Sequence, residues 1–179
     1  DSKYGVSVKN CTIGLSLLKA PVIPDMFADL GEQEFTYSLY VFNKPFAESG
    51  TVQEAYNLNN PLIFAQIPEN ALSNEKSYFT VSNKKIILET VKLPFESDKT
   101  KSSKKNSSKK IILRIYESVG ATENCVLSTV LPIKKAFITD MQENILQEIA
   151  EKDLQRKSSS VQLNLNFTPF EIKTILLEI

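Results

Sequence analysis

Two stretches of this chain alternate apolar and polar residues with a period of two, a rhythm typical of β-strands. The odd positions of 35–42 are all apolar, with Thr36 and Ser38 on the other face. The alternation in 161–167 is stricter, because four apolar residues stand against three polar ones. Since successive side chains of a strand point to opposite faces, each stretch predicts a strand, and 161–167 one with a wet side.

Shorter segments that are rich in β-branched and aromatic residues, and bounded by Pro, Gly, Asn or Ser, predict further strands. They are 5–8, 13–18, 78–81, 86–91, 111–117, 125–131, 136–139 and 172–178. About ten short strands separated by turn signals favour an antiparallel β-sandwich over a βαβ fold. We therefore expect an all-β chain with at most one or two short helices, in which 1–179 forms a single sandwich domain.

A lysine- and serine-rich tract, 99–110, lies between two similar segments, 85–89 and 110–114. Their likeness predicts an antiparallel pair whose connection is lengthened by a polar surface loop, which loop-closure entropy tolerates well. The tract could touch phosphate, yet its composition is also that of a solvated loop. The formal net charge is zero, so we expect no nucleic-acid partner. We also expect no membrane span, because no apolar run approaches about 20 residues.

Two segments are ambiguous. Helical spacing in 51–57, followed by Asn59, Asn60 and Pro61, predicts a short helix that stops there. The segment 141–155 also has an apolar stripe at helical spacing, with many Glu and Gln opposite. Periodicity alone would make this second segment a helix.

Several chemistries are hard to build from this composition. The chain has no histidine and two cysteines far apart in sequence, Cys11 and Cys125, so a zinc site of familiar type and a Ser-His-Asp or Cys-His arrangement cannot be assembled. Its five glycines stand alone, without a phosphate-loop pattern. The two cysteines could form one disulfide, but we expect reduced thiols.

Carboxylate chemistry remains open. Asp25, Asp29, Glu32 and Glu34 gather in the loop before the stretch 35–42. Such groups could supply the two carboxyls of a glycosidase, coordinate calcium through oxygen, or only solvate a loop. We favour a structural role for them, since no EF-hand spacing is present and acidic surface loops are common.

Two charged residues, Arg114 and Glu117, interrupt the apolar segment 111–117 near its end. They could form an outward-facing ion pair, which contributes at most about 1 kcal/mol when exposed. Alternatively, they could lie at a sheet end and face a partner domain or a sugar.

Several stretches together resemble the C-terminal β-region of glycoside hydrolase family 38 α-mannosidases, most closely the subgroup with the animal cytosolic and fungal vacuolar enzymes. These stretches are 16–21, 24–25, 31–37, 54–62, 88–92, 113–118 and 167–174. They run in order along nearly the whole chain. The resemblance implies a cytoplasmic or a vacuolar or lysosomal location.

The resemblance also implies a function. Members of that family are retaining exo-mannosidases, which remove α-linked mannose with an aspartate nucleophile and a zinc, or in some members cobalt, bound by His and Asp. Those groups lie in the N-terminal α/β part and the helical segment after it, so this chain would be an accessory β-sandwich with no catalytic residue and no metal ligand of its own. Its partners would be those parts of the same enzyme and a mannose-containing oligosaccharide.

The carboxylates Asp25, Asp29, Glu32 and Glu34, together with Arg114 and Glu117, then become candidates for the substrate rim or an interdomain contact. The family often has histidine at the position of Gln33, so a contact made by that histidine is in doubt here. Relatives have a turn between extended segments where 141–155 stands, and we favour strand and turn over helix there.

Two other interpretations stay open. The chain could be a free-standing carbohydrate-binding or adhesion sandwich, although it has no tryptophan for an aromatic platform. It could also be an enzyme that works through the carboxylates of 25–34.

Overall fold

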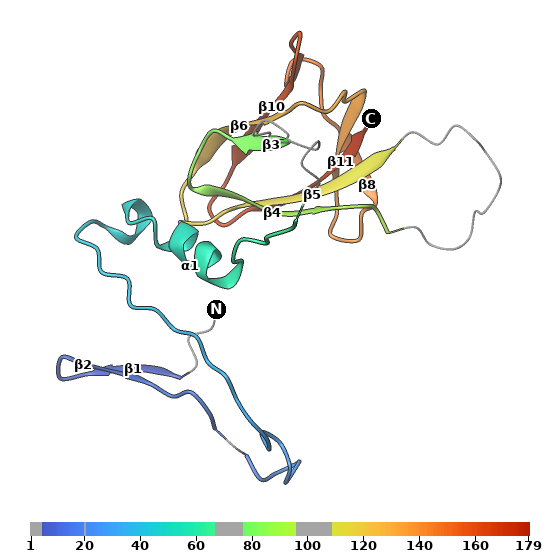
Figure 1. Ribbon diagram of the computed structural model, residues 1–179. Helices are drawn as coiled ribbons and strands as arrows, with labels where there is room; N and C mark the ends of the chain where they lie inside the picture. Colours follow the sequence, from blue (N-terminus) through green and yellow to red (C-terminus); the bar gives the residue numbers. More distant parts are fainter. Residues whose placement is uncertain (1–4, 20, 67–76, 96–108) are drawn as a thin grey trace. The chain divides into compact units, whose positions relative to one another are not determined.

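The computed structural model describes residues 5–19, 21–66, 77–95 and 109–179 (Figure 1). The chain divides into two compact units, Asp1–Ile63 and Phe64–Ile179, which we call the N-terminal unit and the sandwich unit. Each unit is considered by itself below. The prediction that 1–179 forms a single domain stays a prediction.

The sandwich unit contains a four-stranded and a five-stranded sheet (Figure 1). The smaller sheet has the order β3 (Phe79–Val81), β6 (Glu123–Thr129), β10 (Val161–Phe167) and β9 (Leu154–Arg156). The larger has the order β4 (Ile86–Lys92), β5 (Lys110–Glu117), β11 (Ile172–Glu178), β7 (Lys135–Thr139) and β8 (Ile145–Glu148). Every pairing in both sheets is antiparallel. The predicted all-β antiparallel sandwich is confirmed.

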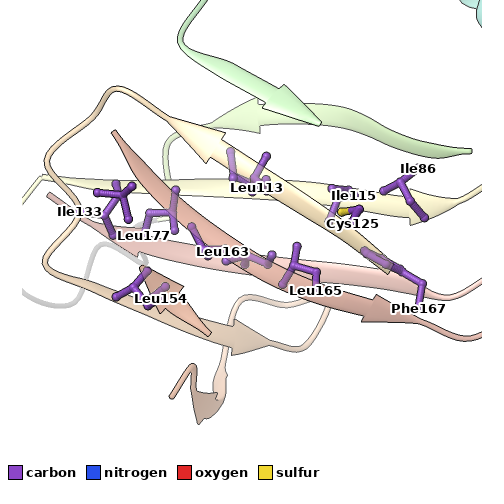
Figure 2. Close-up of a cluster of buried hydrophobic side chains, with 14 residues drawn as sticks. Ile86, Leu113, Ile115, Cys125, Ile133, Leu154, Leu163, Leu165, Phe167 and Leu177 are labelled. Atoms are coloured by element: carbon purple, nitrogen blue, oxygen red, sulfur yellow. The ribbon is translucent and has the colours of Figure 1, made fainter. Parts of the chain in front are cut away.

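The core lies between these two sheets and follows the period-two pattern. All four apolar residues of β10 are buried, and Leu163 pairs in register with the buried Leu127 of β6. Leu113 and Ile115 of β5 bring the larger sheet into the same cluster (Figure 2). Each such aliphatic side chain contributes about 1.5–3 kcal/mol when it is fully buried. The alternation in 161–167 therefore specified both the strand and its inward face.

The segments 85–89 and 110–114 were predicted to form an antiparallel pair, and the strands at these segments, β4 and β5, do pair antiparallel. The register brings 86–88 opposite 115–117 and 90–92 opposite 112–114. Strands β4 and β5 run antiparallel from Ile86, opposite Glu117, to Lys92, opposite Ile112, with a register shift between Leu88 and Thr90. Most of the tract 99–110 lies outside the described residues. Its last residue, Lys110, begins β5, and its Nζ lies 3.1 Å from an Oε1 of Glu178 on β11.

The segment 141–155 contains no helix. It holds a turn, the strand β8 and the beginning of β9, so the strand-and-turn interpretation is confirmed and the helical one is wrong. Glu143 has a positive φ of 71°, which breaks a helix in what would be its first turn, and the residues that follow pair with β7 as the strand β8.

The N-terminal unit begins with a β-hairpin made of β1 (Val6–Lys9) and β2 (Thr12–Leu15). Asn10 and Cys11 form its two-residue turn, both with positive φ, as the twist of a tight hairpin requires. A 3₁₀ turn, η1 (Phe46–Glu48), and the helix α1 (Thr51–Asn59) are the other regular elements in the described part of this unit. The short helix predicted from residue 51 is confirmed.

The strand predicted at 35–42 is wrong for this structure, which has no regular secondary structure there. A strand needs a neighbour for its backbone hydrogen bonds and a layer to cover its apolar face. Within the described residues, 35–42 has neither, and Leu39 and Val41 are 78% and 80% exposed. The alternation is present in the sequence but is not used in this chain.

Both cysteines are free thiols. Cys11 is exposed in the hairpin turn, whereas Cys125 is buried in the core, where burial raises the pKa of its thiol to about 11. The expectation of reduced thiols agrees with this. Among the described helices, none has the length and apolar character needed to cross a membrane.

Candidate functional site

A cleft of about 530 Å³ lies on the outer face of the five-stranded sheet. It is lined by the end of β4 and the residues after it, by β5, and by the turn that joins β7 to β8. The lining residues are Lys92, Phe95, Arg114, Met141, Gln142, Glu143 and Asn144. We call it the Arg114 cleft, because Arg114 was already a candidate site residue from the sequence.

Arg114 points to the outer face because its neighbours Leu113 and Ile115 point into the core. One of its nitrogens, Nη2, donates a hydrogen bond to the carbonyl oxygen of Met141 at 3.2 Å and lies 3.9 Å from Oε1 of Glu143. Its Nε is buried and has no hydrogen-bond partner among the described residues. The guanidinium therefore holds the β7–β8 turn against β5.

Glu143 is the anion of the cleft. Its carboxylate forms an ion pair with Lys92 and accepts a hydrogen bond from the backbone N–H of Phe95 at 2.6 Å. The hydrogen bond from Lys92, together with the Phe95 N–H and the charges of Lys92 and Arg114, lowers the pKa of Glu143 against the opposing effect of burial. Glu143 also has a positive φ of 71°, an uncommon conformation for a side-chain-bearing residue.

Asp140 sets the conformation of that turn. Its Oδ1 accepts hydrogen bonds from the backbone N–H groups of Gln142 and Asn144, both at 2.9 Å. Its Oδ2 accepts a third from the side-chain amide of Asn144, and this contact is the largest reason why the pKa of Asp140 is lowered. These hydrogen bonds fix the conformation of the turn, which places the Glu143 carboxylate near Lys92 and Arg114.

Glu117 does not share this face. It continues the inward row of Leu113 and Ile115, and its side chain is fully buried. Its carboxylate accepts backbone hydrogen bonds from Val119 at 2.9 Å, Gly120 at 2.7 Å and Phe170 at 2.9 Å. The interpretation of Arg114 and Glu117 as an outward-facing pair is therefore wrong, because three positions along a strand place two side chains on opposite faces.

Two opposing effects set the pKa of Glu117. Burial raises the pKa of this carboxyl, but hydrogen bonds from the N–H groups of Phe170, Val119, Gly120 and Ala121 together lower it below its ordinary value of 4.5. The group is thus a buried carboxylate held by backbone dipoles. It joins the turn after β5 to the turn before β11.

The four carboxylates predicted from the acidic loop all lie in the N-terminal unit and are exposed. Asp25 caps its own turn, because its Oδ1 accepts a hydrogen bond from the N–H of Phe27 at 2.9 Å. Across the described ranges, no group of three or more His, Cys, Asp and Glu side chains is placed to hold a metal ion. The calcium alternative for this loop therefore has no support in its geometry.

Sequence reasoning missed Lys92 and Glu143 as members of the cleft. The contact from Phe95 to Glu143 spans 48 residues, and no local pattern predicts it. A weaker signal was present, because Asp140 and Asn144 bracket the turn with the residue types that close such turns on themselves.

Chemically, the Arg114 cleft offers two cations, one carboxylate that pairs with them, side-chain amides from Gln142 and Asn144, and the ring of Phe95, which is 79% exposed. Such a set can accept and donate hydrogen bonds to hydroxyl groups. The pairing of Glu143 with cations keeps it ionised, so it is poorly suited to act as a general acid.

Two antiparallel sheets packed on a shared apolar core define a β-sandwich domain. The sequence model of the glycosyl hydrolases family 38 C-terminal beta sandwich domain matches residues 85–175. The chain belongs to this family.

Individual relatives extend the match over nearly the whole chain. The chain is 37% identical to human alpha-mannosidase 2C1 over 99% of its length, and 36% identical to the mouse protein of the same name over 98%. It is 32% identical to alpha-mannosidase G of Dictyostelium discoideum over 97%. The chain covers only 15–16% of the length of these relatives.

Proposed function

We propose that this chain is the C-terminal accessory β-domain of an α-mannosidase that hydrolyses terminal α-linked mannose in oligosaccharides or N-glycans. The observation that carries the proposal is the match of 98–99% of this chain to named α-mannosidases. The chain covers 16% of the length of these relatives. The domain supports the remainder of the enzyme and borders its substrate rim or an interdomain contact. The enzyme works in the cytoplasm or in a vacuolar or lysosomal compartment.

The metal of such an enzyme does not fit this chain. The sequence has no histidine, and the described residues offer no metal-holding group. Zinc or cobalt would be held by the catalytic and helical parts that precede this region in the enzyme, and no step of the reaction is assigned to residues of this chain.

Comparison of the intact enzyme with the isolated chain tests the proposal. The intact protein should release mannose from a synthetic α-mannoside, and the isolated chain, folded by circular dichroism, should release none. The proposal fails if the isolated chain hydrolyses the mannoside, or if the intact protein acts only on other glycosides.

A second candidate is a free-standing carbohydrate-binding or adhesion module. The exposed Phe95 beside the paired charges of the Arg114 cleft favours it, because sugars stack on aromatic rings and bond to charged groups. Titration of mannose oligosaccharides onto the isolated chain separates the two. Saturable binding that is lost in Phe95→Ala supports the module. If calorimetry detects no heat of binding at any ratio of oligosaccharide to protein, the accessory domain is supported.

A further inference from the structure

One row of apolar side chains in the N-terminal unit is left uncovered. It consists of Phe35, Tyr37, Leu39 and Val41, which are 42%, 69%, 78% and 80% exposed. Their spacing places them on one face of an extended segment, which we call the apolar row. An uncovered row of this regularity is more typical of an interaction surface than scattered apolar residues are.

The opposite face of the same segment is already attached to its own unit. The hydroxyl of Tyr40 donates a hydrogen bond to the carbonyl oxygen of Ser49 at 2.7 Å, and Ser49 is buried. The rings of Tyr40 and Phe42 also contact each other, with centroids 5.9 Å apart. The segment is thus attached through Tyr40 to the residue that follows η1, while Tyr37, Leu39 and Val41 on the other face stay mostly exposed.

The backbone of the segment is also unused. No backbone hydrogen bond joins 35–42 to any other segment that the structure describes. An extended segment with free N–H and C=O groups is a template for another strand. The segment therefore presents both requirements of strand addition, backbone groups for a ladder and alternate side chains for an apolar layer.

The N-terminal unit cannot meet these requirements alone. Every buried apolar side chain among the described residues belongs to the sandwich unit. The only paired strands of the N-terminal unit, within its described part, are β1 and β2, and an isolated two-stranded hairpin is marginally stable in water. This unit needs a covering partner to become a stable layer.

We propose that 35–42 becomes a strand by pairing with the edge of a sheet in the part of the enzyme outside this chain. The inference rests on the proposed function and names the partner of this region. The chain covers about 16% of its human relative, so most of the enzyme is available to supply that edge. The apolar row then enters the core of the partner's sheet.

The charges around the segment limit the partners that it can pair with. Asp25, Asp29, Glu32 and Glu34 precede the segment, and no Lys or Arg lies between Lys19 and Lys44. A parallel pair of two copies would bring these like charges together and is disfavoured. An antiparallel pair would place Lys44 of one copy near Glu34 of the other, and the concentration dependence tested below separates that case from pairing within the enzyme. The receiving edge should carry basic side chains near Glu32 and Glu34.

Hydrogen exchange of single amides in the intact enzyme tests the inference, because paired amides exchange slowly. We expect at least alternate amides of 36–42 to exchange about a hundredfold or more below their intrinsic rates, as one paired edge requires. The variant Tyr37→Ser/Leu39→Ser should lose most of this protection. The matched control on the other face, Thr36→Ala/Ser38→Ala, should keep it.

Three results would overturn the inference. The first is exchange of 36–42 within about tenfold of intrinsic rates in the intact enzyme, since a paired strand cannot exchange so fast. The second is equal protection in the isolated chain, and the third is protection that rises with enzyme concentration, as pairing between copies requires. If the double variant does not fold, Leu39→Ala, read by the same amides, replaces it.

Mannosidase activity measured on the same samples separates this inference from the proposed function. Activity without protection overturns the strand addition alone. Protection without activity on any mannoside overturns the proposed function and leaves the pairing in place.

Discussion

The backbone N–H of Phe170 donates a hydrogen bond to the Glu117 carboxylate at 2.9 Å across 53 residues of sequence. The contact joins the end of β5 to the turn before β11, two strands that pair along their whole length. A carboxylate, which strands seldom bury, thus locks the two turns that frame one end of the sandwich. Glu117 is as buried as a core residue, yet its carboxylate accepts backbone hydrogen bonds as a capping side chain does.

Replacing Glu117 with glutamine should lower the free energy of unfolding by about 1–3 kcal/mol, because the amide turns a donor toward backbone N–H groups and leaves at least one unsatisfied. Urea unfolding of the chain, followed by circular dichroism, measures the change. Glu148→Gln, at an exposed pair with Lys135, is the control and should change the midpoint little. Equal midpoint shifts in both variants would contradict the buried clamp.

The same carboxylate should make stability fall in acid. Its pKa is lower in the folded state than the ordinary value of 4.5, so its contribution is fully present above that value and is lost as the pH falls through the folded pKa. Unfolding free energies measured from about pH 6 to pH 3 should decline less steeply in Glu117→Gln than in the wild type. Parallel declines would show that Glu117 does not titrate below its unfolded value.

Gly120→Ala should destabilise the chain by about 1–2 kcal/mol, because Gly120 has a φ of +79° that a side-chain-bearing residue adopts at a cost. The added Cβ would also lie 2.7 Å from Cζ of Phe170, but that exposed ring can move aside. The loss should therefore be nearly the same in a Phe170→Ala background. A much smaller loss in that background would mean that the ring, and not the backbone, sets the cost.

Glu143→Gln should lower stability by about 1–3 kcal/mol, since it weakens charge-assisted hydrogen bonds from Lys92 and the backbone of Phe95. Glu148→Gln, whose exposed ion pair with Lys135 has little weight, is the control and should change stability by less than about 0.5 kcal/mol. Thermal unfolding of both variants measures the difference. An unchanged unfolding temperature in Glu143→Gln would show that the contacts of the Arg114 cleft do not stabilise the domain.

Asp25→Asn/Glu34→Gln in the intact protein should leave mannoside turnover within about twofold, because neither carboxylate is placed in a catalytic role. Steady-state kinetics on a synthetic mannoside is the measurement. A loss of several orders of magnitude would revive the interpretation of the 25–34 loop as a catalytic centre.

The parts of the fold that the sequence predicted are those whose partners lie inside the chain. The alternation in β10 found its layer in β6 and β5, so pattern and structure agree. The equally regular 35–42 found none among the described residues. Periodicity states what a segment needs, and only the surrounding chain decides whether that need is met.

The candidate site was predicted in part for a related reason. Arg114 stood out because it interrupts an apolar strand, and it lines the cleft. Glu117 stood out in the same way but faces inward, which the period of two could have indicated from Leu113 and Ile115. Lys92 and Glu143 come together only through the turn that Asp140 closes. Contacts between residues so far apart in sequence produce no local sequence pattern that could predict them.

The difference in exposure between the two cysteines allows the unfolding of the sandwich to be followed by thiol labelling. Cys11 sits in an exposed hairpin turn, whereas Cys125 is enclosed between the sheets with a thiol pKa of about 11. A thiol-specific reagent should modify the first at once and reach the second only when the sheets separate. The slower labelling step therefore reports the rate at which the sandwich comes apart, without any engineered probe.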